Sequence, residues 1–222
     1  MPLLASDVGD AELLFFNNLW SSYEPIDAQL RGRYVWRFPV AGGGFDKGVL
    51  GAALLPAVQL GVVPGAPSRL EPLIDLFSDC GLEVEVQPEM LAWLWTHFAV
   101  EAGVIATAIK AGGVDTFLAD VEWIRESILA VRDALAVVEA RGIDPRSVPD
   151  VQMFFAPERE VAEGIRGLYA SDRAARKIME RHTGREELQR IHHDVLDTGR
   201  ELGVPVPTLQ ALGPFVDAFS IQ

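Results

Sequence analysis

The chain has 222 residues, of which 49% are hydrophobic and 23% charged, a composition typical of a folded globular protein. Its formal net charge of −13 excludes nucleic acid as a partner, because binding to phosphates requires clustered Lys and Arg. Cys80 is the single cysteine, so no intrachain disulfide can form, and no charged and apolar leader opens the chain. These features predict a cytoplasmic protein with no membrane partner.

The segment before Pro88 is predicted to be α/β. Its β-rich runs are separated by Gly and Pro clusters, and they span 12–16, 34–40, 49–54, 58–63 and 82–86. Residues 68–80 are predicted to form a helix that Ser68 caps and Gly81 ends. The run Gly42–Gly44 links two strands and does not open a helix, so it indicates a hairpin or a substrate-side loop and no phosphate cradle.

The segment after Pro88 is helical in its periodicity. The predicted helices span 89–111, 115–141, 158–169, 171–181, 185–202 and 208–219. The longest apolar stretch is interrupted by His97 and Glu101, which favours a buried helix over a membrane span. The sequence therefore predicts two domains, 1–88 and 89–222.

His97 and Glu101 are the strongest candidates for catalysis. They are spaced by four on a predicted helix, so their side chains lie one turn apart and can form a hydrogen bond. Such a pair can hold a protonated imidazole that donates a proton to a developing alkoxide. A histidine whose ring is hydrogen-bonded within a helix interface, with no catalytic role, fits the same spacing. Both interpretations stay open.

Other polar and aromatic residues give weaker signals. Asn17 and Asn18 directly follow an apolar strand, where a parallel sheet meets its ligand crevice, although a turn also uses Asn. The adjacent His192 and His193 face different directions, so no metal site is predicted. The tryptophans are typical of a core or a subunit interface, and they are Trp93, Trp95 and Trp123.

Several segments follow one another in a recognisable order. They are LLFFNNLW at 13–20, VAGGG at 40–44, QLG at 59–61, the helix before Gly81, LWTHFAV at 94–100, REE at 185–187 and GRELGVPVPT at 199–208. This order resembles the ketopantoate reductase (2-dehydropantoate 2-reductase) family from about Glu12 onward. The resemblance implies that 1–88 is a remnant of a Rossmann-type domain. It also implies that 89–222 is a helical substrate and dimerisation domain of the 6-phosphogluconate dehydrogenase-like type.

The resemblance also implies a function and site residues. It implies NADPH-dependent reduction of a 2-oxo acid or related carbonyl by a homodimer. Asn18 matches an asparagine near the nicotinamide and the substrate, and Glu187 matches a substrate-binding glutamate. His97 stands at the position of the catalytic lysine, whereas Glu101 replaces a substrate-contacting asparagine. Because the Glu101 carboxylate would repel an anionic substrate unless His97 stays charged, ketopantoate itself is not the expected substrate.

The sequence contains no G-x-G-x-x-G turn to hold the pyrophosphate of NADP. We therefore expect cofactor-dependent activity in the complete protein and none from this chain alone. One alternative is a cofactor-free descendant that binds a small molecule or catalyses a non-redox proton transfer. Another is a non-catalytic helical dimerisation protein, which an exposed Trp123 would favour.

Overall fold

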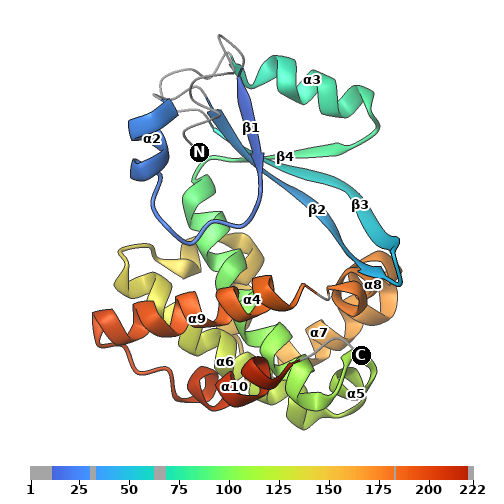
Figure 1. The fold of residues 1–222 in the computed structure, drawn as a ribbon, viewed down its shortest axis with the longest axis vertical. Coiled ribbons are helices and arrows are strands. Elements are labelled where there is room, and N and C mark those ends of the chain that lie inside the picture. The colour runs from blue at the N-terminus through green and yellow to red at the C-terminus, as the bar shows by residue number, and fades with distance from the viewer. Residues whose placement is uncertain (1–11, 31–33, 63–68, 183, 220–222) are drawn as a thin grey trace. The chain divides into compact units, whose positions relative to one another are not determined.

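The computed structural model describes residues 12–30, 34–62, 69–182 and 184–219, and it confirms an α/β part followed by helices (Figure 1). The chain forms two compact units. Unit 1 comprises residues up to 40 together with 55–94, and unit 2 comprises 41–54 together with 95–222.

The described strands form a four-stranded sheet in the order β1-β2-β3-β4. Their bounds are Leu13–Phe16 for β1, Tyr34–Asp46 for β2, Val49–Gly61 for β3 and Glu83–Gln87 for β4. β1 is parallel to β2, with Phe15 opposite Trp36, and β3 is parallel to β4, with Val58 opposite Val84. The runs predicted as separate strands, 49–54 and 58–63, are in fact one strand as far as Gly61.

Of the two predictions for Gly42–Gly44, the hairpin is correct and the loop is wrong. These glycines lie inside β2, and the hairpin turns at Lys47 and Gly48, which have φ angles of 47° and 81°. Two adjacent residues with positive φ match the twist of a two-residue hairpin, which explains the position of the turn. A Cβ on Gly42 would lie 2.4 Å from Ile178 Cγ2, so this glycine allows the strand to approach α8 (Arg173–Arg181).

The two faces of the sheet in unit 1 differ. α3 (Glu71–Asp79) covers one face, and its predicted cap, Ser68, lies outside the described residues. The core beneath it consists of Val35, Leu60 and Leu70 with partly buried Leu14, Val62, Leu73, Ile74 and Val84. The other face carries an aromatic cluster of Phe15, Tyr23, Tyr34 and Trp36. α2 (Glu24–Leu30), which the sequence reasoning missed, follows Tyr23.

Unit 2 contains most of the helices. The bounds are Met90–Ala111 for α4, whose first residues belong to unit 1, Val114–Ala119 for α5, Val121–Ala140 for α6, Glu158–Ser171 for α7, Arg185–Leu202 for α9 and Pro207–Ala218 for α10. Two short 3₁₀ helices, Pro145–Ser147 and Pro149–Phe155, connect α6 to α7. The single helix predicted over 115–141 is broken at Asp120. The backbone of Asp120 is extended, and its carboxylate accepts a hydrogen bond from Glu122 N and so caps α6.

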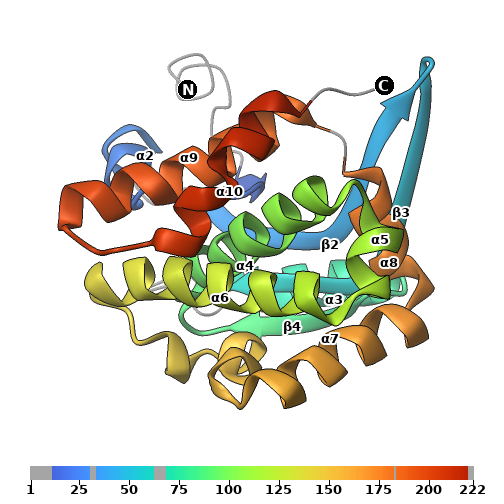
Figure 2. The same cartoon turned by 90° about the horizontal axis from the view of Figure 1, so that it is seen from below.

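α6 is the central helix of unit 2. It packs against α5, α7, α9 and α10 (Figure 2), and it buries Ile124, Ile128, Val131 and Val138 completely. A Cβ on Gly103 of α4 would lie 2.6 Å from Val131 N, so α4 and α6 are in close backbone contact. α4 is long and apolar enough to cross a membrane, but 72% of its most apolar window is buried inside the protein. This burial is typical of a core helix.

Candidate functional site

His97 and Glu101 form an ion pair on α4. The distance from His97 Nε2 to Glu101 Oε1 is 3.4 Å, and the two side chains are 30% and 18% exposed. The pair follows from local geometry, since residues four apart on a helix lie on one face. The pair therefore places an imidazole and a carboxylate side by side, and these are the side-chain types that most often carry protons in catalysis.

A second ion pair joins His182 and Glu187 within unit 2. His182 directly follows α8, Glu187 lies in the first turn of α9, and His182 Nε2 is 3.4 Å from Glu187 Oε2. Burial alone would lower the pKa of His182. The hydrogen bond to Glu187 and the negative charges of Glu101 and Glu187 outweigh that effect and raise it. His182 therefore keeps its proton to a higher pH than a free imidazole does.

Glu101 connects the two pairs electrostatically. Its charge acts on His182 of the second pair and on Tyr169 of α7. Burial, and then the charge of Glu101, raise the pKa of Tyr169, so its hydroxyl stays protonated and able to donate a hydrogen bond. The charge of Glu101 on α4 thus influences groups on α7 and after α8, all within unit 2.

The structure brings together part of the predicted site. His97, Glu101 and Glu187 all belong to unit 2, and Glu187 is connected to the other two through His182. Asn18 lies in unit 1 after β1, where the side chain of Asn17 donates a hydrogen bond to its carbonyl at 2.7 Å. The roles assigned to these residues stay predictions.

Sequence reasoning missed His182 and Tyr169. The contact between His182 and Glu187 crosses the break between α8 and α9, so no helical spacing marks it. Tyr169 lies on α7, far along the chain from the residue whose charge acts on it. Neither residue forms part of a recognisable motif, and only the packing of α7 and α8 reveals them.

The other histidines and tryptophans have structural surroundings. His192 is 1% exposed, and burial, with a further contribution from His193, lowers its pKa to about 4. His193 instead pairs with Asp217 at 2.9 Å on the surface. Trp93 and Trp95 are buried, whereas Trp123 is half-buried, with Lys110 Nζ 5.5 Å from the centre of its ring. The exposed Trp123 that would favour a pure dimerisation role is not observed.

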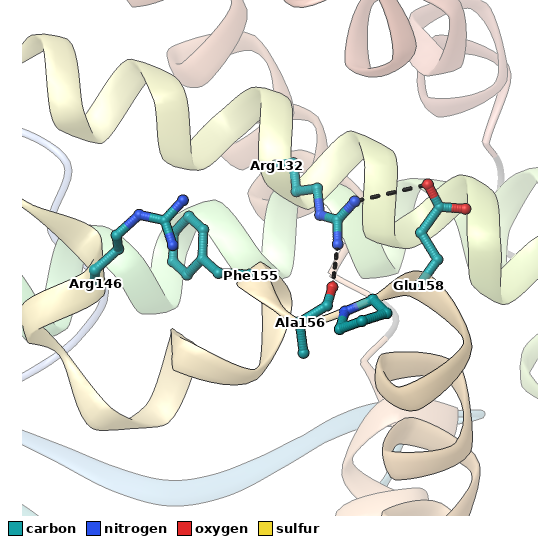
Figure 3. A pocket seen from close by; sticks show the side chains of 6 residues that line it. Arg132, Arg146, Phe155, Ala156 and Glu158 are labelled. Carbon is teal, nitrogen blue, oxygen red and sulfur yellow. Dashed lines mark hydrogen bonds and ion pairs between the residues drawn. The ribbon is translucent and has the colours of Figure 1, made fainter.

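A cavity of about 660 Å³ lies beside the connection between α6 and α7 (Figure 3). Arg132 on its wall donates from Nε to Phe154 O at 2.7 Å and from Nη2 to Ala156 O at 2.6 Å. Its Nη1 lies 3.7 Å from Glu158, so all three guanidinium nitrogens have partners. Because the charge of Arg132 holds the backbone in place, we assign this cavity a structural role.

Neither models of protein families nor the sequences of curated proteins match the chain. Solved structures do match it. A 2-dehydropantoate 2-reductase from Geobacter metallireducens GS-15 has a TM-score of 0.63 at 14% identity, with 93% of this chain and 67% of that chain covered. The fold is that of the ketopantoate reductases.

Two further structures extend the comparison. A dimeric ketopantoate reductase from Staphylococcus aureus has a TM-score of 0.56 at 14% identity, with 84% of this chain and 59% of that chain covered. D-mandelate dehydrogenase with NADH and anilino(oxo)acetate has a TM-score of 0.60 at 14% identity, with 97% of this chain and 85% of that chain covered. The chain therefore spans about three fifths of the length of the Staphylococcus aureus enzyme. At these identities the similarity shows the fold alone.

Proposed function

We propose that the chain supplies the proton-transfer part of an oxidoreductase that, as a complete protein, reduces the carbonyl group of a 2-oxo acid or a related carbonyl with NADPH. The fold supports this proposal, because it is shared by ketopantoate reductases and by a dehydrogenase solved with NADH and an oxoacetate. The observation that carries it is the His97–Glu101 pair. The Glu101 carboxylate of this pair also raises the pKa values of His182 and Tyr169.

In this proposal His97 is the general acid. Its ring gives a proton to the carbonyl oxygen as negative charge develops there, and Glu101, whose Oε1 lies 3.4 Å from Nε2, orients the ring. His182 supplies a positive charge, which Glu187 sustains. This charge offsets the negative charge of Glu101, so an anionic substrate does not meet an uncompensated carboxylate.

The residues of the chain do not fit the phosphates of NADP. The sequence has no G-x-G-x-x-G turn, and within the described residues no helix begins at a glycine-rich turn after a strand. Asn18, at the end of β1, is the residue proposed to lie near the nicotinamide. NADPH, which would supply the hydride when bound, is therefore assigned to the complete protein.

Oxidation of NADPH by the complete protein from its native source, measured with a panel of 2-oxo acids, tests the proposal. We expect His97→Gln to lower kcat by about 100-fold or more, the usual contribution of a general acid. The matched control is His193→Gln, since His193 pairs with Asp217 on the surface, and its kcat should not change. An unchanged kcat in His97→Gln would assign the proton to another group.

The substrate charge can be tested separately through His182. Because its pKa is raised, His182 loses its proton only as the pH rises above the ordinary range for histidine. The KM for a 2-oxo acid should therefore increase with pH, while the KM for an uncharged ketone should not. A His182→Gln variant should remove this pH dependence and leave kcat nearly unchanged.

A non-redox proton transfer is the second candidate, because the proton-transfer residues are present without a site for the dinucleotide phosphates. The 222-residue chain would then exchange hydrogens next to the carbonyl of a 2-oxo acid with deuterium from D₂O, without a nucleotide. Magnetic resonance of the substrate measures this exchange, and His97→Gln should abolish it.

The homodimer stays a proposal that the dimeric Staphylococcus aureus enzyme supports.

A further inference from the structure

A separate cavity of about 290 Å³ lies in unit 1. It is found where β2 begins, where β3 ends at Gly61 and where the chain enters α4 after Pro88. β1 is parallel to β2, and its Asn17 and Asn18 follow the end of β1 that is farther from the cavity. The cavity is therefore distinct from the predicted position of the nicotinamide, and its volume suits a small molecule.

Aromatic rings line one side of this cavity. Tyr23 and Trp36 stack with their ring centres 5.7 Å apart and their planes 13° from parallel, and Tyr34 meets both rings nearly edge-on. Phe15 stacks on the same Trp36 at 5.0 Å, which fixes the indole from the neighbouring strand. Such a rigid group of electron-rich rings attracts organic cations.

Carboxylates supply the charge. Asp27 and Glu89 both line the cavity, and Asp27 accepts a hydrogen bond of 2.7 Å from the Tyr34 hydroxyl. Burial raises the pKa of Tyr23 far above its ordinary value, and the charges of Asp27 and Glu89 raise it further, so both carboxylates act on the aromatic wall. Arg69 also lines the cavity, but Glu12 pairs with it and neutralises its charge.

The indole nitrogen of Trp36 provides a third, independent observation. Trp36 is 4% exposed, and its Nε1 has no hydrogen-bond partner in the described part of the chain. A buried N–H group ordinarily has an acceptor, and indole can only donate. A ligand with an acceptor oxygen would supply the missing hydrogen-bond acceptor.

We propose that this cavity binds a small organic ammonium ion that also carries a hydroxyl or carbonyl oxygen, an amino alcohol being the simplest example. The rings of Tyr23 and Tyr34 receive the ammonium group, and Asp27 and Glu89 balance its charge. The oxygen accepts the hydrogen bond of Trp36 Nε1. An anion is disfavoured by the same carboxylates, and a hydrated metal ion would gain little from the rings.

Choline and its neutral carbon analogue, 3,3-dimethylbutan-1-ol, test the proposal on the 222-residue chain, because they share a shape and differ in charge. Titration calorimetry at 150 mM salt should show saturable binding of choline and at least about tenfold weaker binding of the alcohol. Asp27→Asn keeps an acceptor for Tyr34 and should weaken choline binding about fivefold or more. The matched control on the same helix is Glu24→Gln, which lies outside the cavity lining and should have no effect.

Trp36→Phe tests the role of the acceptor oxygen, because it retains an aromatic ring and removes the N–H group. It should weaken the binding of choline and leave that of tetramethylammonium, which has no oxygen, nearly unchanged. Equal binding of choline and the alcohol would overturn the proposal in favour of a purely apolar cavity. If a folded chain binds neither choline nor ethanolamine at 10 mM, a Kd on the order of 1 mM or lower is excluded. That result would overturn the proposal entirely.

Discussion

The two units differ in how their cationic side chains are paired. In unit 2, the partly exposed Lys110 lies 2.5 Å from Glu126, and all three guanidinium nitrogens of the partly exposed Arg132 have partners. In unit 1, Arg37 is completely buried, and its guanidinium has no hydrogen-bond partner among the described residues. It lies against the rings of Phe16 and Phe77, at 5.7 Å and 4.4 Å, and burial lowers its pKa to about 10.

This difference shows where further contacts can act. A buried charge with its partners in place contributes to a defined fold, whereas one without them costs free energy until something compensates it. Unit 2 provides partners for Lys110 and Arg132. Unit 1 leaves Arg37 and the Trp36 indole without hydrogen-bond partners among the described residues, so a ligand or additional chain that contacts them would change its stability.

The largest expected effect concerns His192, which unit 2 buries as a neutral ring. Its pKa of about 4 lies below the ordinary value of 6.5, so the unfolded chain binds the extra proton between these values. The free energy of unfolding should therefore fall as the pH decreases from 6.5 towards 4, by about 3 kcal/mol from this residue. Urea unfolding at a series of pH values measures the change.

Carboxylates also titrate in this range. The pH dependence of the free energy of unfolding should therefore be compared between the wild type and His192→Gln, and it should be shallower in the variant. The ring signals of His192 in magnetic resonance report its pKa directly and do not depend on how well the variant folds. A pKa near 6.5 would contradict the prediction.

The next effect concerns a paired cation of unit 2. Arg132→Met keeps the length of the side chain but leaves Phe154 O and Ala156 O without their donor. We expect the free energy of unfolding to fall by about 2 kcal/mol, since hydrogen bonds from a charged group are among the stronger ones and this side chain is partly exposed. Arg146→Met is the control, because Arg146 stacks on Phe155 nearby and should matter less.

The same substitution in unit 1 should have the opposite sign. Arg37→Met removes a buried charge without hydrogen-bond partners and keeps an apolar chain between Phe16 and Phe77. We expect the free energy of unfolding to rise by about 1 to 2 kcal/mol. A loss of stability on urea unfolding would show that the contacts with the rings outweigh the cost of burial, and the contrast between the units would fail.

The smallest effect concerns the break that separates α5 from α6. Asp120→Ala removes the carboxylate that accepts from Glu122 N, and it should cost about 1 kcal/mol in the free energy of unfolding. Asp120→Asn keeps an acceptor and should restore most of this loss. Thermal unfolding of both variants measures the difference, and equal melting temperatures would exclude a capping role.

The sequence by itself determined the order of the two parts of the chain and the resemblance in fold. Periodicity predicted an α/β part followed by helices, because alternation and helical spacing are local properties of the chain. It also determined that His97 and Glu101 lie together, since one helical turn separates them whatever surrounds the helix.

Tertiary structure decided the rest. The union of two predicted strands into β3 depends on pairing with neighbouring strands, which no local pattern records. The influence of Glu101 on Tyr169 and His182 requires three separate segments to pack together. The buried surroundings of Arg37 and Trp36 arise in the same way, because burial and electrostatic environment are set by contacts between residues far apart in the chain.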